Sequence, residues 1–419
     1  MLTGPQRGNE AFSRLAAGPD GRPGSCYDPT RMNTWDVIVI GGGAVGSAAL
    51  RAASEAGARA LVLEQFTPAH AGGSSHGESR IFRHAYFEHP DYVPLLRHST
   101  SRFESLERES GTALLRRCGM LTFGSPDSAS VHGSLGSARR WGLDVEALDA
   151  STMRSRFPWF SLADDALGAF EADAGIVRPE AAVAASIRVA RSRGAALRVD
   201  TRVRGLVEEG NGVSVETDHG RERASAVIVA SGPWTVRLLP ELAPLLKVTR
   251  QVQAWVAPAA GVDASEMPCW LLDRGPSERA VYGLAPDPVA PARPGRVSTR
   301  ASCPKVGLHG SDDLVDPDAG AAPVDDRDIE RICRAYRAAA PGLAGRLVEA
   351  ATCLYTMSPD GQFLVGRRRG CTRTWFAAGL SGHGFKLAPA LGDALAELAI
   401  HGRTDLPVDF LSPARFGHS

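Results

Sequence analysis

The sequence predicts an α/β protein, in which a Rossmann-type unit is joined to a second region of short strands. The first indication is residues 35–64, where an apolar strand, a glycine-rich turn, a helix-length segment and a second apolar strand follow one another. The second is that two more apolar strands, 227–230 and 375–378, each run into a glycine-containing turn. The third is a set of short alternating runs between 202 and 224, a pattern typical of antiparallel strands.

Three glycines open the Rossmann-type unit, in the order Gly41-x-Gly43-x-x-Gly46. Gly41 permits a tight turn, Gly43 leaves room for a pyrophosphate beside the backbone, and Gly46 lets the following helix pack close to the strand. The helix N-terminus offers free N–H groups to the phosphates. Glu64 ends the second strand, where it is placed to accept a hydrogen bond from a ribose 2′-hydroxyl. Because an acid would repel a 2′-phosphate, the pattern favours FAD or NAD over NADP; a glycine turn without a ligand is the alternative.

Composition argues against several classes of protein. The 419 residues include 47 basic and 47 acidic ones, so no excess of positive charge points to nucleic acid or to an anionic membrane. No apolar run approaches the roughly 18 residues of a transmembrane helix. The seven cysteines are scattered and no secretory signal is recognised, so we expect reduced thiols in a cytoplasmic protein. Neither metal-ligand spacing nor a hydrolase signature occurs, and no metal is expected.

Residues 1–33 are rich in Gly, Pro and Arg, and we expect a disordered extension there. The remaining elements follow from helical periodicity and from strand alternation. In order, we expect a helix at 92–109, short strands with a polar helix over 119–174, a helix at 179–193, a meander of strands at 202–209, 212–217 and 222–224, a strand at 227–230, strand-like segments over 248–302 broken by loops at 258–268 and 285–296, a helix at 325–340, a strand at 375–378 and a helix at 388–401.

The glycine-containing turns lie far apart in the sequence. Ser231 and Gly232 follow one apolar strand, and Gly379, Gly382 and Gly384 follow another near the C-terminus. If both ends of the chain return to one nucleotide site, a long cofactor is indicated, which favours FAD over NAD.

Four motifs are more specific than the glycine pattern, and they resemble one family of enzymes. These motifs are PAHAGGSSHGESRIFRHAY at 68–86, KVGLH at 305–309, ATCLYTMSPD at 351–360 and GLSGHGFK at 379–386. From about residue 34 to 412 the chain resembles the sarcosine oxidase and N-methyltryptophan oxidase family of amine-oxidising flavoproteins. The resemblance implies a glutathione-reductase-like FAD domain formed by 34–118, 175–245 and 346–412. It implies a mostly antiparallel substrate domain, with helices, formed by 119–174 and 246–345.

The resemblance assigns Cys353 to the cofactor. In the family, the cysteine of this C-x-Y-T motif carries FAD covalently through the 8α-methyl carbon of the flavin. A thiolate that attacks an electrophilic flavin would form such a thioether, whereas a buried apolar cysteine is the alternative. The other cofactor contacts implied by the resemblance and by the turns are Gly41, Gly43, Gly46, Glu64, His76, Ser79, Arg80, Val203, Ser231, Gly232, Gly379, Gly382, Gly384 and Lys386.

The resemblance assigns the substrate carboxylate to Arg83 and Lys386. A guanidinium suits bidentate binding of a carboxylate, and a lysine adds a point charge. Lys305 corresponds to the family lysine that promotes reaction of the reduced flavin with oxygen, since a cation stabilises the anion that forms. Lysine occurs at three positions, Lys247, Lys305 and Lys386, so two of the three lysines stand at functional positions of the family.

His309 corresponds to the family histidine that faces the bound amine. Tyr282 and Tyr355 correspond to aromatic residues of the pocket, and so does Tyr86, for which core packing is an equal alternative. The chain departs from the family at Gly361-Gln362 and in the 285–296 loop, which puts the identity of the substrate in doubt more than the reaction type.

Together these residues predict an FAD-dependent oxidase of a secondary or N-methylated amino acid, which forms an imine and hydrogen peroxide. A cyclic imino-acid oxidase of the pipecolate or proline type, and an FAD dehydrogenase with an acceptor other than oxygen, remain alternatives. A non-enzymatic flavin-binding protein is disfavoured, because a binder needs neither a covalent flavin nor a cation that activates oxygen. The expected partners are a small amino acid and oxygen, with no nucleic acid and no membrane, and we expect a monomer.

Overall fold

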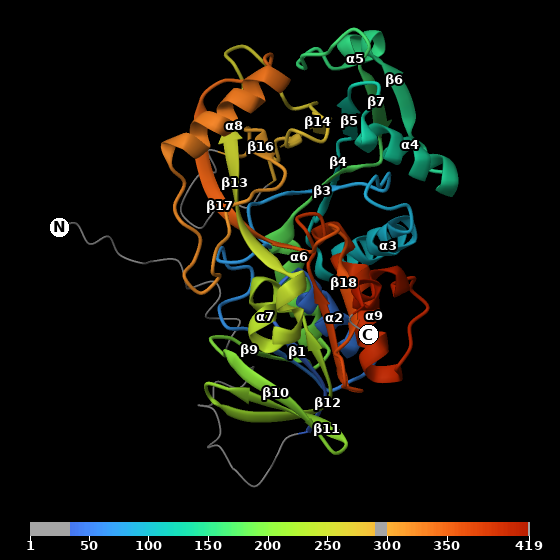
Figure 1. Cartoon of the computed structure of the whole chain (residues 1–419), viewed down its shortest axis with the longest axis vertical. Coiled ribbons are helices and arrows are strands. Elements are labelled where there is room, and N and C mark those ends of the chain that lie inside the picture. The colour runs from blue at the N-terminus through green and yellow to red at the C-terminus, as the bar shows by residue number, and fades with distance from the viewer. Residues whose placement is uncertain (1–33, 290–299, 418–419) are drawn as a thin grey trace, which may run out of the picture.

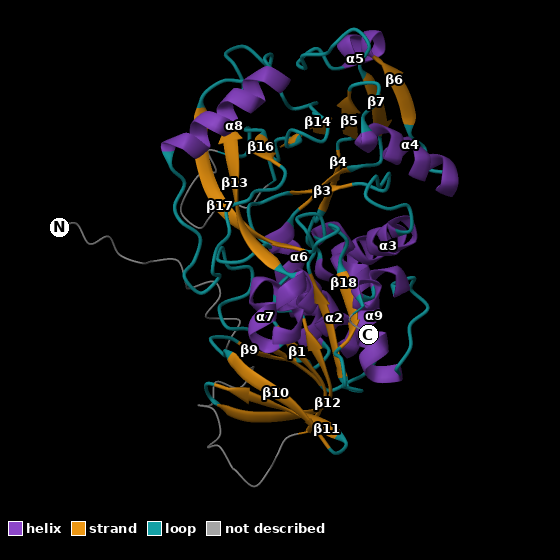
Figure 2. Ribbon diagram, in the orientation of Figure 1, coloured by secondary structure: helices purple, strands orange, loops and turns teal. Residues whose placement is uncertain are grey.

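The computed structural model describes residues 34–289 and 300–417. The predicted extension 1–33 and part of the predicted loop 285–296 lie outside the described residues. Two large sheets occupy opposite parts of the molecule, with a small sheet between them (Figures 1 and 2). In the described part of the chain, no helix is both long enough and apolar enough to cross a bilayer.

The first sheet has eight strands and contains the Rossmann-type unit. Its central strands pair parallel, β12 with β1, β1 with β2 and β2 with β9, and β19 lies parallel to the C-terminal half of β12. A meander of β10, β11 and the first half of β12 extends one side. The strands are β1 (Thr34–Ile40), β2 (Ala60–Leu63), β9 (Ala196–Arg198), β10 (Val203–Glu209), β11 (Gly212–Thr217), β12 (Gly220–Val229), β18 (Leu364–Arg367) and β19 (Thr374–Ala378).

One detail of the meander was predicted wrongly. The sequence suggested separate strands at 222–224 and 227–230, but β12 is one continuous strand over Gly220–Val229. Its polar first half pairs with β11, and its apolar second half is central in the sheet, so the change in residue type marks a change of neighbours within one strand.

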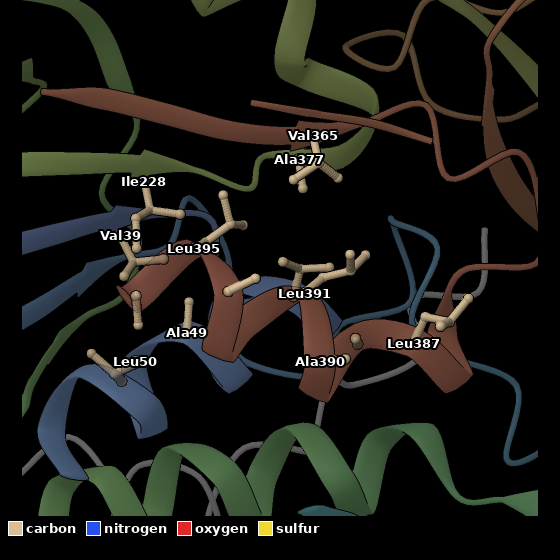
Figure 3. Packing of buried hydrophobic residues seen from close by; sticks show 14 of the residues in the cluster. Val39, Ala49, Leu50, Ile228, Val365, Ala377, Leu387, Ala390, Leu391 and Leu395 are labelled. Atoms are coloured by element: carbon tan, nitrogen blue, oxygen red, sulfur yellow. The ribbon is translucent and has the colours of Figure 1, made fainter. Parts of the chain in front are cut away.

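Four helices cover one face of this sheet. They are α2 (Ala44–Glu55), α3 (Tyr92–Ser110), α6 (Pro179–Ser192) and α9 (Ala388–His401), close to the predicted ranges. Helix α9 packs on α2, and Figure 3 shows Leu391 and Leu395 of α9 in the same cluster as Ala49 of α2 and Val39 of β1. The two helices approach closely because Gly392 has no side chain: a Cβ there would lie 2.6 Å from the Ala48 Cβ.

The second sheet also has eight strands, and each neighbouring pair is antiparallel except β14 with β5. Helix α8 packs on β13, β15 and β16, while α4 and α5 cover the β5–β7 end, around a separate hydrophobic core. The elements are β5 (Met120–Gly124), α4 (Ala129–Trp141), β6 (Glu146–Asp149), α5 (Ala150–Arg156), β7 (Leu167–Glu171), β13 (Lys247–Val256), β14 (Cys269–Asp273), β15 (Val281–Leu284), β16 (Lys305–Leu308), α8 (Asp326–Ala339) and β17 (Leu347–Met357). The α/β first sheet and the mostly antiparallel second sheet confirm the predicted fold class.

A small antiparallel sheet joins the two parts (Figure 1). It contains β3 (Arg80–Phe82), β8 (Gly175–Val177) and β4 (Leu115–Arg117). Short helical turns complete the fold at Gly232–Trp234, Thr235–Leu238 (α7), Pro240–Leu245, Phe385–Leu387, Asp409–Leu411 and Pro413–Phe416.

Strand β17 differs from the predicted domain limits. The predicted boundary at 346 places it in the cofactor domain, but β17 pairs with β13 from Leu347 to Met357 in the second sheet. Beyond β17 the chain enters the first sheet through β18 and β19, so residues 347–357 lead directly from one sheet to the other. The remaining domain limits stay a prediction.

Candidate functional site

A cavity of about 260 Å³ lies among the first sheet, the second sheet and the segment 69–88. It brings together almost all of the predicted site residues. Those that line it are Gly41, Gly43, Glu64, Ser79, Arg80, Arg83, Val203, Ser231, Gly232, Tyr282, Lys305, His309, Cys353, Tyr355, Gly379, Gly382, Gly384 and Lys386. Gly46, His76 and Tyr86 are not part of its lining.

The glycine-rich turn has the geometry that its sequence predicts. Gly41 adopts φ +97°, and a Cβ there would lie 2.6 Å from the Ala230 carbonyl oxygen of the neighbouring turn. Gly46 does not face the cavity but sets the helix position, because a Cβ on it would lie 1.8 Å from the Gly41 carbonyl oxygen. For Gly43, the nearest atom to such a Cβ is the Ser75 Oγ at 3.6 Å, so this glycine is not required by protein packing. Its place at the cavity wall fits close approach of a ligand.

Glu64 is buried and already has two backbone partners. Its Oε2 accepts a hydrogen bond from the Gly42 N–H at 2.7 Å, and its Oε1 accepts one from the Phe66 N–H at 2.8 Å. The His70 Nε2 lies 3.8 Å away. A carboxylate has about four lone-pair sites, so the capacity to accept a bond from a ribose hydroxyl remains. These contacts hold the carboxylate at the end of β2, where it faces the cavity.

One buried group of the cavity wall has no partner among the described residues. It is the Nε2 of Gln253, on β13. This amide packs against Gly77, since a Cβ there would lie 2.4 Å from the Gln253 Nε2. The open backbone at Gly43 and the N-terminus of α2, whose N-cap residue makes no side-chain hydrogen bond, indicate that the residues present fit a dinucleotide such as FAD.

Cys353 lies on β17 and faces the cavity, although it is only 6 % exposed. Its Sγ lies 3.7 Å from a terminal nitrogen of Arg80 and 3.9 Å from the carbonyl oxygens of Gly73 and Ser74. The Arg80 guanidinium is fixed by bonds to the Ser74 and Ser79 carbonyl oxygens, each 2.9 Å. A positive charge is therefore held beside the sulfur.

Lys305, at the start of β16, is 3 % exposed. Its Nζ donates to the Gly77 carbonyl oxygen at 2.9 Å and also to the Ser79 carbonyl oxygen. Burial, and then the charge of Arg80, hold the pKa of Lys305 well below its usual range. The turn that supplies the carbonyls is fixed by Glu180, whose carboxylate accepts the Gly77 N–H at 2.6 Å and the Glu78 N–H at 3.1 Å. Glu180 lies in the first turn of α6, a favourable position for a carboxylate.

His76 precedes this turn and is buried at 7 % exposure. Its Nε2 has no hydrogen-bond partner among the described residues. Burial lowers the pKa of His76 to about 3, and the charges of Arg80 and Lys305 add to this effect, so the imidazole is neutral. His76 is not among the residues that line the cavity. Its contact with the cofactor stays a prediction.

Arg83 was predicted to bind a substrate carboxylate, and the structure shows it bound to a carboxylate of the protein. One terminal nitrogen donates to both oxygens of Glu88, at 2.7 and 2.8 Å, and the other donates to the Ala85 carbonyl oxygen at 2.6 Å. Glu88 itself lines the cavity. Although burial opposes ionisation, the charge of Arg83 helps to hold the pKa of Glu88 at about 2, so the pair is ionic.

Lys386 is buried beside this pair. Its Nζ donates to the His383 carbonyl oxygen at 2.8 Å and lies 5.0 Å from the centre of the Tyr86 ring. Burial lowers the pKa of Lys386 to about 7, and the charge of Arg83 acts in the same direction. Tyr86 is fully buried, which agrees with the core-packing alternative, but its ring contacts both cations.

His309, Tyr282 and Tyr355 meet at the same end of the cavity. The rings of His309 and Tyr355 are 5.9 Å apart. Burial lowers the pKa of His309 and raises those of both tyrosines, so all three side chains are uncharged near neutral pH. Gly382 makes room for Tyr355, since a Cβ there would lie 2.1 Å from its ring. These groups form a neutral wall next to the cationic pair.

Sequence reasoning missed four residues that shape the site: Ser75, Glu88, Glu180 and Gln253. Ser75 accepts a hydrogen bond from the Ala44 N–H at 3.2 Å, at the N-terminus of α2. Glu88 stands five positions after Arg83 and two positions after the end of the 68–86 motif. An acidic residue so close to this arginine in the sequence could have suggested an ion pair. Glu180 and Gln253 come from segments more than 70 residues apart in the chain, and only the fold brings them to the same turn.

Comparison with known proteins agrees with this geometry. The family model for FAD-dependent oxidoreductases, DAO, matches residues 36–398. Monomeric sarcosine oxidase from Streptomyces avermitilis is 36 % identical over 390 residues, which covers 91 % of this chain and 98 % of that protein. N-methyl-L-tryptophan oxidase from Salmonella typhimurium is 34 % identical over 387 residues, with the same coverage of 91 % and 98 %.

Solved structures give the same result. The open form of NikD, described as an unusual amino acid oxidase essential for nikkomycin biosynthesis, superposes with a TM-score of 0.77 at 29 % identity. The match covers 91 % of this chain and 97 % of NikD. The sheets, the cavity and these relatives lead to one conclusion: this chain belongs to the FAD-dependent oxidoreductase family.

Proposed function

We propose that this enzyme oxidises a small amino acid with a secondary or N-methylated amine, with oxygen as the electron acceptor. The observation that carries the proposal is that one cavity holds two neighbouring basic side chains, Arg83 and Lys386, beside a neutral wall, and a separate buried lysine, Lys305. The relatives that act on sarcosine and on N-methyl-L-tryptophan support the same class of substrate. FAD, when bound, would take up the two electrons and the hydrogen from the C–H bond next to the amine nitrogen.

The two basic side chains, Arg83 and Lys386, would bind the carboxylate of the substrate. Arg83 is already placed for a carboxylate, because it holds both oxygens of Glu88. We expect the substrate to take the place of Glu88 on the guanidinium and to contact the ammonium group of Lys386. Such charge-assisted bonds contribute about 1.5–3 kcal/mol each.

The neutral wall would receive the amine. His309, Tyr282 and Tyr355 carry no charge near neutral pH, and the cations Arg83 and Lys386 lie close by. An ammonium substrate would find no anion there once Glu88 has been displaced. The site therefore selects the uncharged amine, whose lone pair supports loss of hydrogen from the neighbouring carbon.

Lys305 would stabilise negative charge as oxygen is reduced. An ammonium has three N–H donors, and the carbonyl groups of Gly77 and Ser79 take two of them. The third remains for a reduced oxygen species, and the surrounding burial strengthens that interaction. The products would be hydrogen peroxide and an imine, which hydrolyses in water.

Cys353 would attach the cofactor covalently through a thioether to the 8α-carbon of the flavin. Its sulfur faces the cavity with the Arg80 guanidinium 3.7 Å away. Forming this bond breaks one S–H and one C–H bond, and the two electrons released would be removed by oxygen. Attachment would fix the ring of the cofactor relative to β17.

A cyclic secondary amino acid is the second candidate substrate. Apolar side chains form part of the cavity wall near Tyr282, and they would suit a ring as well as an N-methyl group. They are Ile81, Phe87, Met120, Leu271 and Leu284. An FAD dehydrogenase that uses another acceptor is less well supported, because it has no need of the Lys305 cation.

A comparison of acids with their decarboxylated amines tests the carboxylate site. We expect the wild-type enzyme to turn over N-methyl amino acids and to act poorly on the corresponding amines. Arg83→Ala should raise KM for the acid by about 10- to 100-fold, equivalent to roughly 1.5–3 kcal/mol. Peroxide formation measures the rates, and flavin absorbance confirms that the cofactor is still bound.

Arg51→Ala is the matched control, because Arg51 is also buried and ion-paired, to Glu109 at 2.5 Å, but does not line this cavity. Its KM should equal that of the wild type. If an amine without a carboxylate proved as good a substrate as the acid, the proposed binding mode would be wrong.

A further inference from the structure

Two cations of the cavity share one aromatic ring. The Arg83 Cζ lies 4.5 Å from the centre of the Tyr86 ring, and the Lys386 Nζ lies 5.0 Å from it. The face of an aromatic ring is negative and attracts cations within about 6 Å. Two buried cations so close together repel each other, and a ring that contacts both offsets part of that repulsion.

The Tyr86 ring is held in place at its hydroxyl group. The Tyr86 Oη lies 2.5 Å from the His383 Nδ1, and the His383 Nε2 lies 2.9 Å from the Gly361 carbonyl oxygen. A carbonyl oxygen only accepts, so Nε2 carries the hydrogen. In a neutral imidazole the Nδ1 is then an acceptor, and Tyr86 is the donor. Burial lowers the pKa of His383 to about 4, which keeps this imidazole neutral.

The same histidine also ties down Lys386. The His383 carbonyl oxygen accepts the Lys386 Nζ at 2.8 Å and lies 3.3 Å from the Tyr86 Oη, whose one hydrogen is directed to the His383 Nδ1. The His383 ring packs against Phe363, with 4.8 Å between ring centres. Tyr86, His383 and Lys386 therefore form one connected unit. The Arg83 guanidinium packs on the Tyr86 ring of this unit.

We propose that Tyr86 is a positioning residue, which holds Arg83 and Lys386 together as a single binding site for the substrate carboxylate. The ring provides the shared contact, and the hydrogen bond to His383 fixes the ring. The inference rests on the proposed function, because it concerns the same carboxylate. It assigns a role to a buried tyrosine that does not itself line the cavity.

Binding of methoxyacetate to the flavin-loaded enzyme tests this role. Methoxyacetate keeps the carboxylate and chain length of N-methylglycine but has no amine to oxidise, and methoxyacetamide is its uncharged counterpart. The shift in flavin absorbance gives Kd for each. We expect Tyr86→Leu to raise Kd for methoxyacetate by roughly ten-fold, the effect of two lost cation–π contacts. Tyr86→Phe keeps the ring and should give a rise of roughly two- to three-fold. Kd for methoxyacetamide should change in neither variant.

Tyr336→Leu is the matched control, because Tyr336 is equally buried, in α8 of the second sheet, and its Kd values should equal those of the wild type. Equal weakening of both ligands by Tyr86→Leu, or no weakening of methoxyacetate, would overturn the inference. If Tyr86→Leu does not fold, the test rests on Tyr86→Phe alone. An unchanged Kd of this variant for methoxyacetate would then overturn the positioning role of Tyr86.

Arg83→Ala separates this result from the proposed function. If Arg83→Ala weakens methoxyacetate and the Tyr86 variants do not, the positioning role fails while the carboxylate site stands. If methoxyacetate does not bind to the wild-type enzyme, or binds equally to Arg83→Ala, the carboxylate site and the inference fail together.

Discussion

At the scale of single residues, the predicted site for the substrate carboxylate already contains a carboxylate of the protein, Glu88. Arg83 is not a free cation waiting for a ligand, since both oxygens of Glu88 lie within 2.8 Å of one of its terminal nitrogens. An arginine held in this way is satisfied and ordered before the substrate arrives. The exchange keeps the guanidinium paired in both states, but Glu88 must move toward solvent or another donor as it leaves, because an unpaired buried carboxylate is costly.

The covalent role of Cys353 leads to a simple test. After acid precipitation, we expect flavin absorbance to stay with the polypeptide of the wild type and to appear in the supernatant of Cys353→Ala. Cys371→Ala is the control, because Cys371 does not line the cavity. Flavin found wholly in the supernatant of the wild type would rule out covalent attachment.

The charge of Lys305 is the subject of the next prediction. Lys305→Met keeps the length of the side chain and removes the charge, so it should slow reoxidation of the reduced enzyme by oxygen by about 10²–10³-fold. Reduction by substrate should change much less. Stopped-flow measurement of the two half-reactions separates these effects.

Two further variants sharpen the Lys305 result. Lys305→Arg keeps the charge but changes its shape, and should recover only part of the rate. Lys247→Met is the control, because Lys247 is exposed at the start of β13. Equal slowing of both half-reactions would instead make Lys305 a structural or substrate-binding residue.

Sequence alone could predict these residues where a motif carries them. Cys353, Lys305 and Arg83 each stand in a recognised pattern, and all three line one cavity. It could not show that Arg83 is paired with Glu88, because that contact depends on how residues 84–88 bend back. Nor could it choose between core packing and function for Tyr86, which is buried and yet contacts both cations.

At the scale of elements, the long helices were predicted most closely. Helix α9 begins and ends at the predicted residues, Ala388 and His401, because its apolar periodicity is followed by a glycine in the left-handed conformation, Gly402. Strands were harder. The break predicted within β12 followed a change from polar to apolar residues, but pairing partners, not composition, decide where a strand ends.

The C-terminal glycine turn gives a prediction at this scale. Gly382 adopts φ +80°, and a Cβ there would lie 2.1 Å from the Tyr355 ring. We expect Gly382→Ala to lower both flavin content and kcat/KM, because the turn or Tyr355 must move. Gly402→Ala is a matched control: its φ is +73°, and nothing lies within 4 Å of a Cβ there.

Both glycine variants should lose about 1–2 kcal/mol of stability from the left-handed backbone, which thermal unfolding measures. Only Gly382→Ala should also lose activity. Equal activity in the two variants would show that the close contact between Gly382 and Tyr355 does not matter for the site.

At the scale of the whole molecule, the site depends on two sheets that meet. Strand β17 of the second sheet carries Cys353 and Tyr355, while the turn after β19 of the first sheet carries Lys386. The predicted domain limits placed 347–357 with the first sheet, but β17 pairs with β13 of the second, and residue types alone do not decide which neighbour a strand takes. Strand β17 therefore carries both Cys353, the predicted cofactor cysteine, and Tyr355, which lines the cavity.

One measurement tests the central claim that the enzyme is an oxygen-dependent oxidase of secondary or N-methylated amino acids. Each member of a panel of N-methyl and cyclic amino acids is added to its own sample without oxygen, at one equivalent per flavin, and flavin absorbance is recorded; oxygen is then admitted and peroxide is assayed. We predict that at least one member bleaches the flavin, that oxygen restores the colour, and that one hydrogen peroxide forms per flavin. Bleaching that oxygen does not reverse would contradict the account and indicate a dehydrogenase, and a flavin that no member bleaches would contradict the proposed substrate class.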